Sequence, residues 1–81
     1  MNFEKAAIKG RLAEAEQKVA RQKLLIEGYC QSIRTGLNTA LTPPEELEIA
    51  QIGAQWEALE AAWAELQGAI IEIERLRRSL D

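Results

Sequence analysis

The stretch IAQIGAQWEALEAAWAELQGAIIEI, residues 49–73, carries the strongest structural signal in this chain. Large apolar residues recur in it at alternating steps of three and four, and they are Ile49, Ile52, Trp56, Leu59, Trp63, Leu66, Ile70 and Ile73. This is a heptad repeat, the pattern of an α-helix that buries a narrow apolar seam against another helix. We therefore predict a long helix in which both tryptophans of the chain lie on the buried seam.

The first half of the chain carries a weaker form of the same repeat. Its positions, one of them a glutamine, are Ile8, Leu12, Ala15, Val19, Gln22, Ile26, Tyr29 and Ile33. Residue types with high helix propensity dominate both halves, and the alternation of apolar and polar residues that marks a strand is absent. The sequence therefore predicts one all-α domain over residues 1–81, with helices at about residues 3–35 and 44–80.

The segment between the repeats contains signals that end one helix and begin another, and we expect an elbow over residues 36–43. Gly36 is placed to end the first helix in a left-handed conformation. Thr42 and Glu45 have the spacing of a capping box for the second helix. Because a proline disfavours helical geometry at the residue before it, Pro43 is the alternative cap. A connection this short makes the two helices antiparallel neighbours in a coiled-coil-like hairpin.

A register for this hairpin follows from the two repeats. If the numbers of opposing residues add to 85, every a position of one helix meets a d position of the other. Trp63 then faces Gln22, and Trp56 faces Tyr29. Charge agrees with the pairing of the two halves, because residues 1–40 sum to +3 whereas residues 41–81 sum to −6.

Apolar residues remain outside the predicted seam. On one flank they are Leu25, Ala62, Ala69 and Leu76. An apolar stripe wider than one seam implies a helix that contacts more than one neighbour. A chain of 81 residues also buries only a modest core, and its single cysteine cannot form an intrachain disulfide to reinforce it. We therefore expect two hairpins to pair as a homodimer, forming an antiparallel four-helix bundle.

Residue types needed for catalysis are scarce. The chain has no histidine, which is the usual general base at neutral pH and the commonest metal ligand. Its glycines are isolated, so they do not form a phosphate-binding loop. Cys30 is interpreted as an inert, partly buried thiol, with pairing across a dimer under oxidation as the alternative. The sequence predicts no enzyme and no catalytic, cofactor, metal or small-molecule site.

Nucleic-acid binding is the first alternative function. A hairpin gathers basic residues at its open end, and these are Lys5, Lys9, Arg11, Arg75, Arg77 and Arg78. Such a local excess could contact phosphates. The net charge of −3 argues against a general polyanion binder, and the tryptophan rings that could stack on bases lie elsewhere.

An accessory or chaperone-like protein, which offers a helical face to a partner's helix, is the second alternative. No run of about 20 apolar residues is present, and the start of the chain carries charges where a signal peptide has its apolar stretch. We therefore expect no membrane partner and a cytoplasmic location. Heptads recur in many unrelated proteins and identify no family. The favoured prediction is a non-enzymatic structural or protein-protein interaction module that self-associates through its heptad seams.

Overall fold

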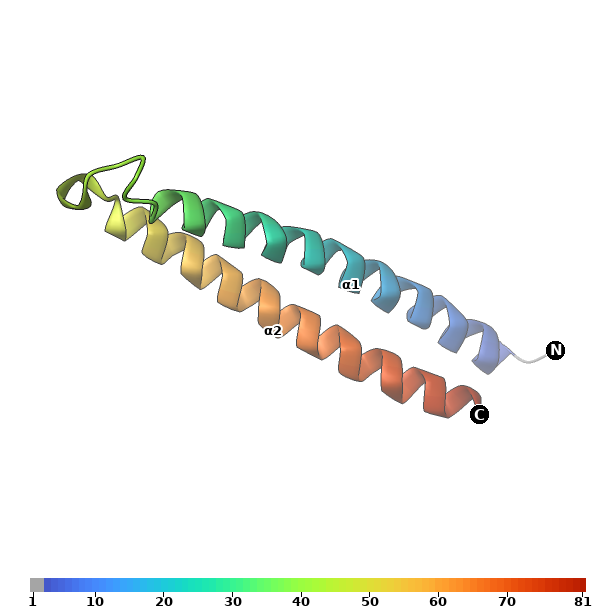
Figure 1. Ribbon diagram of the computed structural model, residues 1–81. Helices are drawn as coiled ribbons and strands as arrows, with labels where there is room; N and C mark the ends of the chain where they lie inside the picture. Colours follow the sequence, from blue (N-terminus) through green and yellow to red (C-terminus); the bar gives the residue numbers. More distant parts are fainter. Residues whose placement is uncertain (1–2) are drawn as a thin grey trace.

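Two long helices packed side by side make up the structure, a computed structural model that describes residues 3–81 (Figure 1). Helix α1 spans Phe3–Gly36 and helix α2 spans Ile49–Leu80, and a short 3-10 helix, η1, lies between them at Pro44–Glu46. The helices run in opposite directions, so the start of α1 and the end of α2 lie together at one end of a rod of 65 × 15 × 15 Å. Residues 3–81 contain no strand. The prediction of an all-α fold of two packed helices is confirmed.

Asn38 makes the turn that follows α1. Its side-chain Oδ1 accepts a hydrogen bond from the Ala40 amide at 3.0 Å, and its carbonyl accepts one from Leu41 at 3.0 Å. This use of a short polar side chain to hold a turn is common for asparagine. Gly36 was expected to reverse the chain in a left-handed conformation, but none of the glycines in the described chain has a positive φ. Gly36 instead allows close approach, since a Cβ atom there would lie 3.2 Å from the Ile52 side chain.

The second helix begins later than predicted, at Ile49. Pro43 has an extended backbone and caps η1, and no side-chain hydrogen bond caps this turn. The N-cap of α2 is Glu48, which makes no side-chain cap hydrogen bond. The predicted capping box of Thr42 and Glu45 is therefore wrong, and the alternative cap, Pro43, begins η1 rather than the second long helix. The 3-10 turn stops at Leu47 because its backbone returns to an extended conformation, and α2 starts only after it.

The inward face of each helix follows a heptad repeat. On α1 the buried and half-buried positions of this repeat are Ile8, Leu12, Ala15, Val19, Gln22, Ile26, Tyr29 and Ile33. On α2 they are Ile52, Gln55, Leu59, Ala62, Leu66, Ala69, Ile73, Leu76 and Leu80. Gly36 lies against Ile52, a pair whose numbers add to 88 rather than the predicted 85. Continued along the helices, this register would place Ala62 opposite Ile26 and Ala69 opposite Val19, so that a small residue meets a large one.

The inward face of α2 therefore matches the predicted one only in part: the shared residues are Ile52, Leu59, Leu66 and Ile73. Ile49, Trp56 and Trp63 were expected to lie between the two helices, but 61%, 53% and 57% of their respective surfaces are exposed. Trp63 does not fill a layer with Gln22, and that part of the predicted hairpin seam is wrong. The distance between two helix axes depends on the side chains at the contact, so alanines allow a close approach that tryptophans would prevent. Helix α2 is accordingly turned so that Ala62 and Ala69 face α1.

Candidate interaction surface

The large apolar residues displaced from the hairpin seam form a line along one flank of α2. Ile49, Trp56, Trp63 and Ile70 follow one another at intervals of seven residues, and we call this line the tryptophan face. The first three are exposed and Ile70 is half-buried. Single exposed apolar residues are ordinary on a protein surface, but a contiguous line with two indole rings is typical of a surface that another chain covers.

Helix α1 borders the tryptophan face along its length. At the open end of the hairpin, Arg77 Nη2 reaches Glu16 Oε1 at 3.4 Å, and Lys23 lines a shallow groove together with Ile70. One heptad further from the open end, continuation of the repeat would place Cys30 beside Trp63. Leu37 directly follows the last residue of α1. Cys30 is half-buried and Leu37 is exposed. The α1 border is therefore charged near the open end and apolar near the elbow.

The opposite flank of the hairpin is polar. Lys18 Nζ forms an ion pair with Glu65 Oε2 across the two helices there. Nearer the elbow, an open hollow is lined mainly by polar side chains, among them Gln31, Ser32, Thr35, Gln51 and Gln55. Within the described chain, the buried Gln55 Oε1 has no hydrogen-bond partner. The two flanks differ in chemistry, and only the tryptophan face offers a line of large apolar side chains.

The predicted dimer flank was Leu25, Ala62, Ala69 and Leu76. In the structure the last three are buried within the hairpin, while Leu25 remains exposed. The prediction of an outer flank is wrong for those three residues, and its cause is the same rotation of α2. On α2, Trp56 and Trp63 lie outside the hairpin where burial was expected, and Ala62, Ala69 and Leu76 are buried where exposure was expected. The tryptophan face is the surface that the sequence analysis missed.

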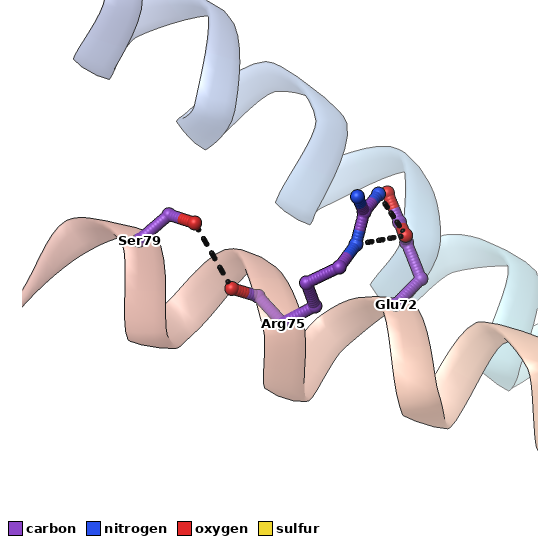
Figure 2. A network of polar contacts seen from close by, with 3 residues as sticks. All are labelled: Glu72, Arg75 and Ser79. Atoms are coloured by element: carbon purple, nitrogen blue, oxygen red, sulfur yellow. Dashed lines mark hydrogen bonds and ion pairs between the residues drawn. The ribbon is translucent and has the colours of Figure 1, made fainter.

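Two of the arginines at the basic open end are held by carboxylates. Arg75 donates from Nε and Nη2 to Glu72 Oε2, at 3.0 and 2.5 Å, and its carbonyl accepts a hydrogen bond from Ser79 Oγ at 3.1 Å (Figure 2). Arg77 contacts Glu16 as described above. The start of α1, which carries Lys5, Lys9 and Arg11, lies at the same end of the hairpin as the end of α2 with its arginines. This end still carries an excess of two positive charges, because residues 3–11 and 72–81 hold six basic and four acidic side chains.

The elbow has the opposite charge. Glu45, Glu46 and Glu48 are exposed there, and residues 37–48 contain no basic side chain. The rod therefore has an acidic end and a basic end, about the length of the molecule apart. Charge separated in this way favours neighbours that run in the opposite direction.

Known proteins supply no function for this chain. Comparison with protein-family models, with curated proteins and with solved structures found no match. In residues 3–81 no helix is both long enough and apolar enough to span a membrane. In the same residues no three or more carboxylate or thiol side chains are grouped so that they could hold a metal ion. The tryptophan face is the candidate functional surface.

Proposed function

We propose that the protein is a non-enzymatic structural or protein-interaction module that self-associates through the tryptophan face into an antiparallel four-helix bundle. The observation that carries this proposal is the line of exposed large apolar side chains on α2. Each helix of such a bundle contacts two neighbours and so has two apolar seams. Helix α2 has both: one seam against α1 and the tryptophan face for a second copy.

Surface area supports the pairing of two copies. The chain exposes 6190 Å², whereas a compact monomer of its 9.1 kDa mass exposes about 4,900 Å². The difference is roughly 1,300 Å² per chain, and a standard stable interface buries about 800 Å² on each partner. The hairpin therefore has enough surplus surface for a dimer of ordinary or larger size.

The small core of the hairpin also supports the pairing of two copies. Its buried apolar residues are Ala15, Ala62, Ala69 and Leu76, and in the described chain no large side chain is fully buried. Three alanines and a leucine stabilise a fold weakly, because hydrophobic stabilisation grows with the apolar area removed from water. Burial of the tryptophan face adds the large side chains that the hairpin leaves in water, so folding and association are expected to be coupled.

A non-enzymatic role agrees with the residue types available. The chain has no histidine, and its acidic side chains are distributed along exposed helix faces. Acid-base catalysis at neutral pH most often uses histidine, and nucleophilic serine or cysteine needs an adjacent base. The proposal therefore assigns the protein to binding and assembly.

Tryptophan fluorescence tests the proposal. At high micromolar concentration we expect blue-shifted emission that iodide quenches poorly, because both indole rings are covered in the dimer. Dilution should shift the emission to the red and increase quenching as the copies separate. Emission that is red-shifted and strongly quenched at every concentration would contradict self-association. In that event, protection of the rings by an added helical protein would assign the tryptophan face to an outside partner.

A further inference from the structure

A second copy can cover the tryptophan face in two ways. A twofold axis along the rod places like ends together and packs α2 of one copy against α1 of the other. An axis across the rod places the elbow of one copy beside the open end of the other and packs α2 against α2. Both arrangements make four helices with antiparallel neighbours, so the choice depends on which surfaces match.

The order of residues in the tryptophan face favours the second arrangement. Ile49, Trp56, Trp63 and Ile70 read Ile-Trp-Trp-Ile in either direction. When two such lines meet head to tail, each tryptophan lies against a tryptophan and each isoleucine against an isoleucine. Contacts across a twofold axis are reciprocal, so residue i contacts j while j contacts i, and a line that reads the same in both directions can pack against its own copy with like side chains in every layer. The alternative sets the same line against an α1 flank that includes the charged Glu16 and Lys23.

Charge also favours the second arrangement. The midpoint of the tryptophan face falls between Leu59 and Glu60, so the numbers of opposing α2 residues add to 119. Arg77 of one copy then lies beside the elbow of the other, next to the acidic helix η1. The basic end of each hairpin meets the acidic end of the other at both ends of the bundle. With the axis along the rod, acidic elbow would meet acidic elbow, and like charges in contact oppose association.

We propose that two copies pack in opposite directions, α2 against α2 along the tryptophan face, with the basic open end of each hairpin beside the acidic elbow of the other. The proposal rests on the proposed self-association. It adds the orientation of the copies and the residues nearest the twofold axis. Its consequence is that a side chain near the midpoint of the tryptophan face meets the same side chain of the second copy.

Glu60 is the position that distinguishes the two arrangements. It lies next to the midpoint and on the same side of α2 as Trp56 and Trp63, from which it is separated by four and three residues. In the proposed bundle the two Glu60 positions are close across the axis. With the axis along the rod, the two α2 helices are diagonal and the same positions are far apart.

Disulfide cross-linking measures this separation directly. The test variant is Glu60→Cys with Cys30→Ser, and the matched control is Glu57→Cys with Cys30→Ser. Both glutamates are exposed on α2, but Glu57 is one residue beyond Trp56, and a helix turns by about 100° per residue, which points it away from the tryptophan face. Circular dichroism of both variants establishes that each keeps its helices before oxidation.

We expect Glu60→Cys to form a covalent dimer about tenfold faster than Glu57→Cys at high micromolar concentration, where the dimer is populated, because neighbouring thiols in a complex have a millimolar effective concentration. Equal rates for the two variants, or a slow reaction in both while the wild-type chain sediments as a dimer, would overturn the orientation and leave self-association intact. A wild-type chain that sediments as a monomer would remove both proposals.

Discussion

Replacing Trp63 with alanine is expected to raise the dissociation constant of the dimer by about a thousandfold. Each dimer loses two indole rings, and a buried interface tryptophan contributes about 2 kcal/mol or more when truncated. A total of about 4 kcal/mol corresponds to about three factors of ten in affinity. The variant Trp56→Ala, Trp63→Ala should be monomeric throughout the micromolar range, and it should lose helicity as well because the remaining core is small.

Sedimentation equilibrium of Trp63→Ala and of a control variant, Ile71→Ala, measures the change in the dissociation constant of the dimer. Ile71→Ala removes an exposed apolar side chain from the same helix, but Ile71 follows Ile70 by one residue and points away from the tryptophan face. Its dimer should dissociate at the same concentration as the wild type. Equal weakening by Ile71→Ala and Trp63→Ala would mean that α2 associates through no particular face, and the assignment of the tryptophan face would fail.

Replacing Ala69 with aspartate is expected to unfold the hairpin. Ala69 is 5% exposed and faces α1, so the new carboxylate would be buried without an ion-pair partner. Burial of an unpaired charge costs several kcal/mol, and a chain of this size has a net stability of about 3 to 5 kcal/mol. Loss of the helical signal at 222 nm in circular dichroism is the expected result.

Ala64→Asp is the matched control for Ala69→Asp. Ala64 is exposed on the outer side of α2, where a carboxylate stays in water. This variant should keep its helices and melt within a few degrees of the wild type. If the two variants were equally folded, the seam that runs through Ala62, Ala69 and Leu76 would be misplaced, and the tryptophans would regain their place between α1 and α2.

The heptad pattern predicts the two helices and their antiparallel packing, but it leaves the rotation of α2 undetermined. Two overlapping seams run along this helix and share Ile52, Leu59, Leu66 and Ile73. One seam adds large residues on one flank, the tryptophans among them, and the other adds Gln55, Ala62, Ala69 and Leu76. Counting large apolar residues favours the first seam. Close packing of two helices favours the second, because small side chains let the backbones approach.

At the helix ends, too, some features could be predicted from the sequence and others could not. The prolines marked the elbow correctly, because the backbone restriction of proline is local and independent of the fold. Gly36 lies against Ile52 of the other helix, a contact that no local rule contains, and the side chain of Asn38 holds the turn that follows. The delayed start of α2 at Ile49 likewise follows from the 3-10 turn at Pro44–Glu46 and the extended Leu47 after it.

The sequence did not predict the tryptophan face as an exposed surface, because the heptad pattern does not determine the rotation of α2. The heptad repeat predicts that both tryptophans are buried. A single sequence does not say whether a heptad seam packs against its own chain or against another. Once α1 occupies the alanine side of α2, the tryptophans can be covered only from outside the hairpin. The rotation of α2 therefore turns a predicted core into a proposed interface.

Sedimentation equilibrium of the wild-type chain, over a dilution series from the high to the low micromolar range, measures whether a second copy covers the tryptophan face. We expect a mass of twice 9.1 kDa at high concentration, which falls toward the single-chain mass on dilution. The same series for Trp56→Ala, Trp63→Ala should give the single-chain mass throughout. A wild-type chain that is folded and has a mass of 9.1 kDa at every concentration would contradict the proposed assembly.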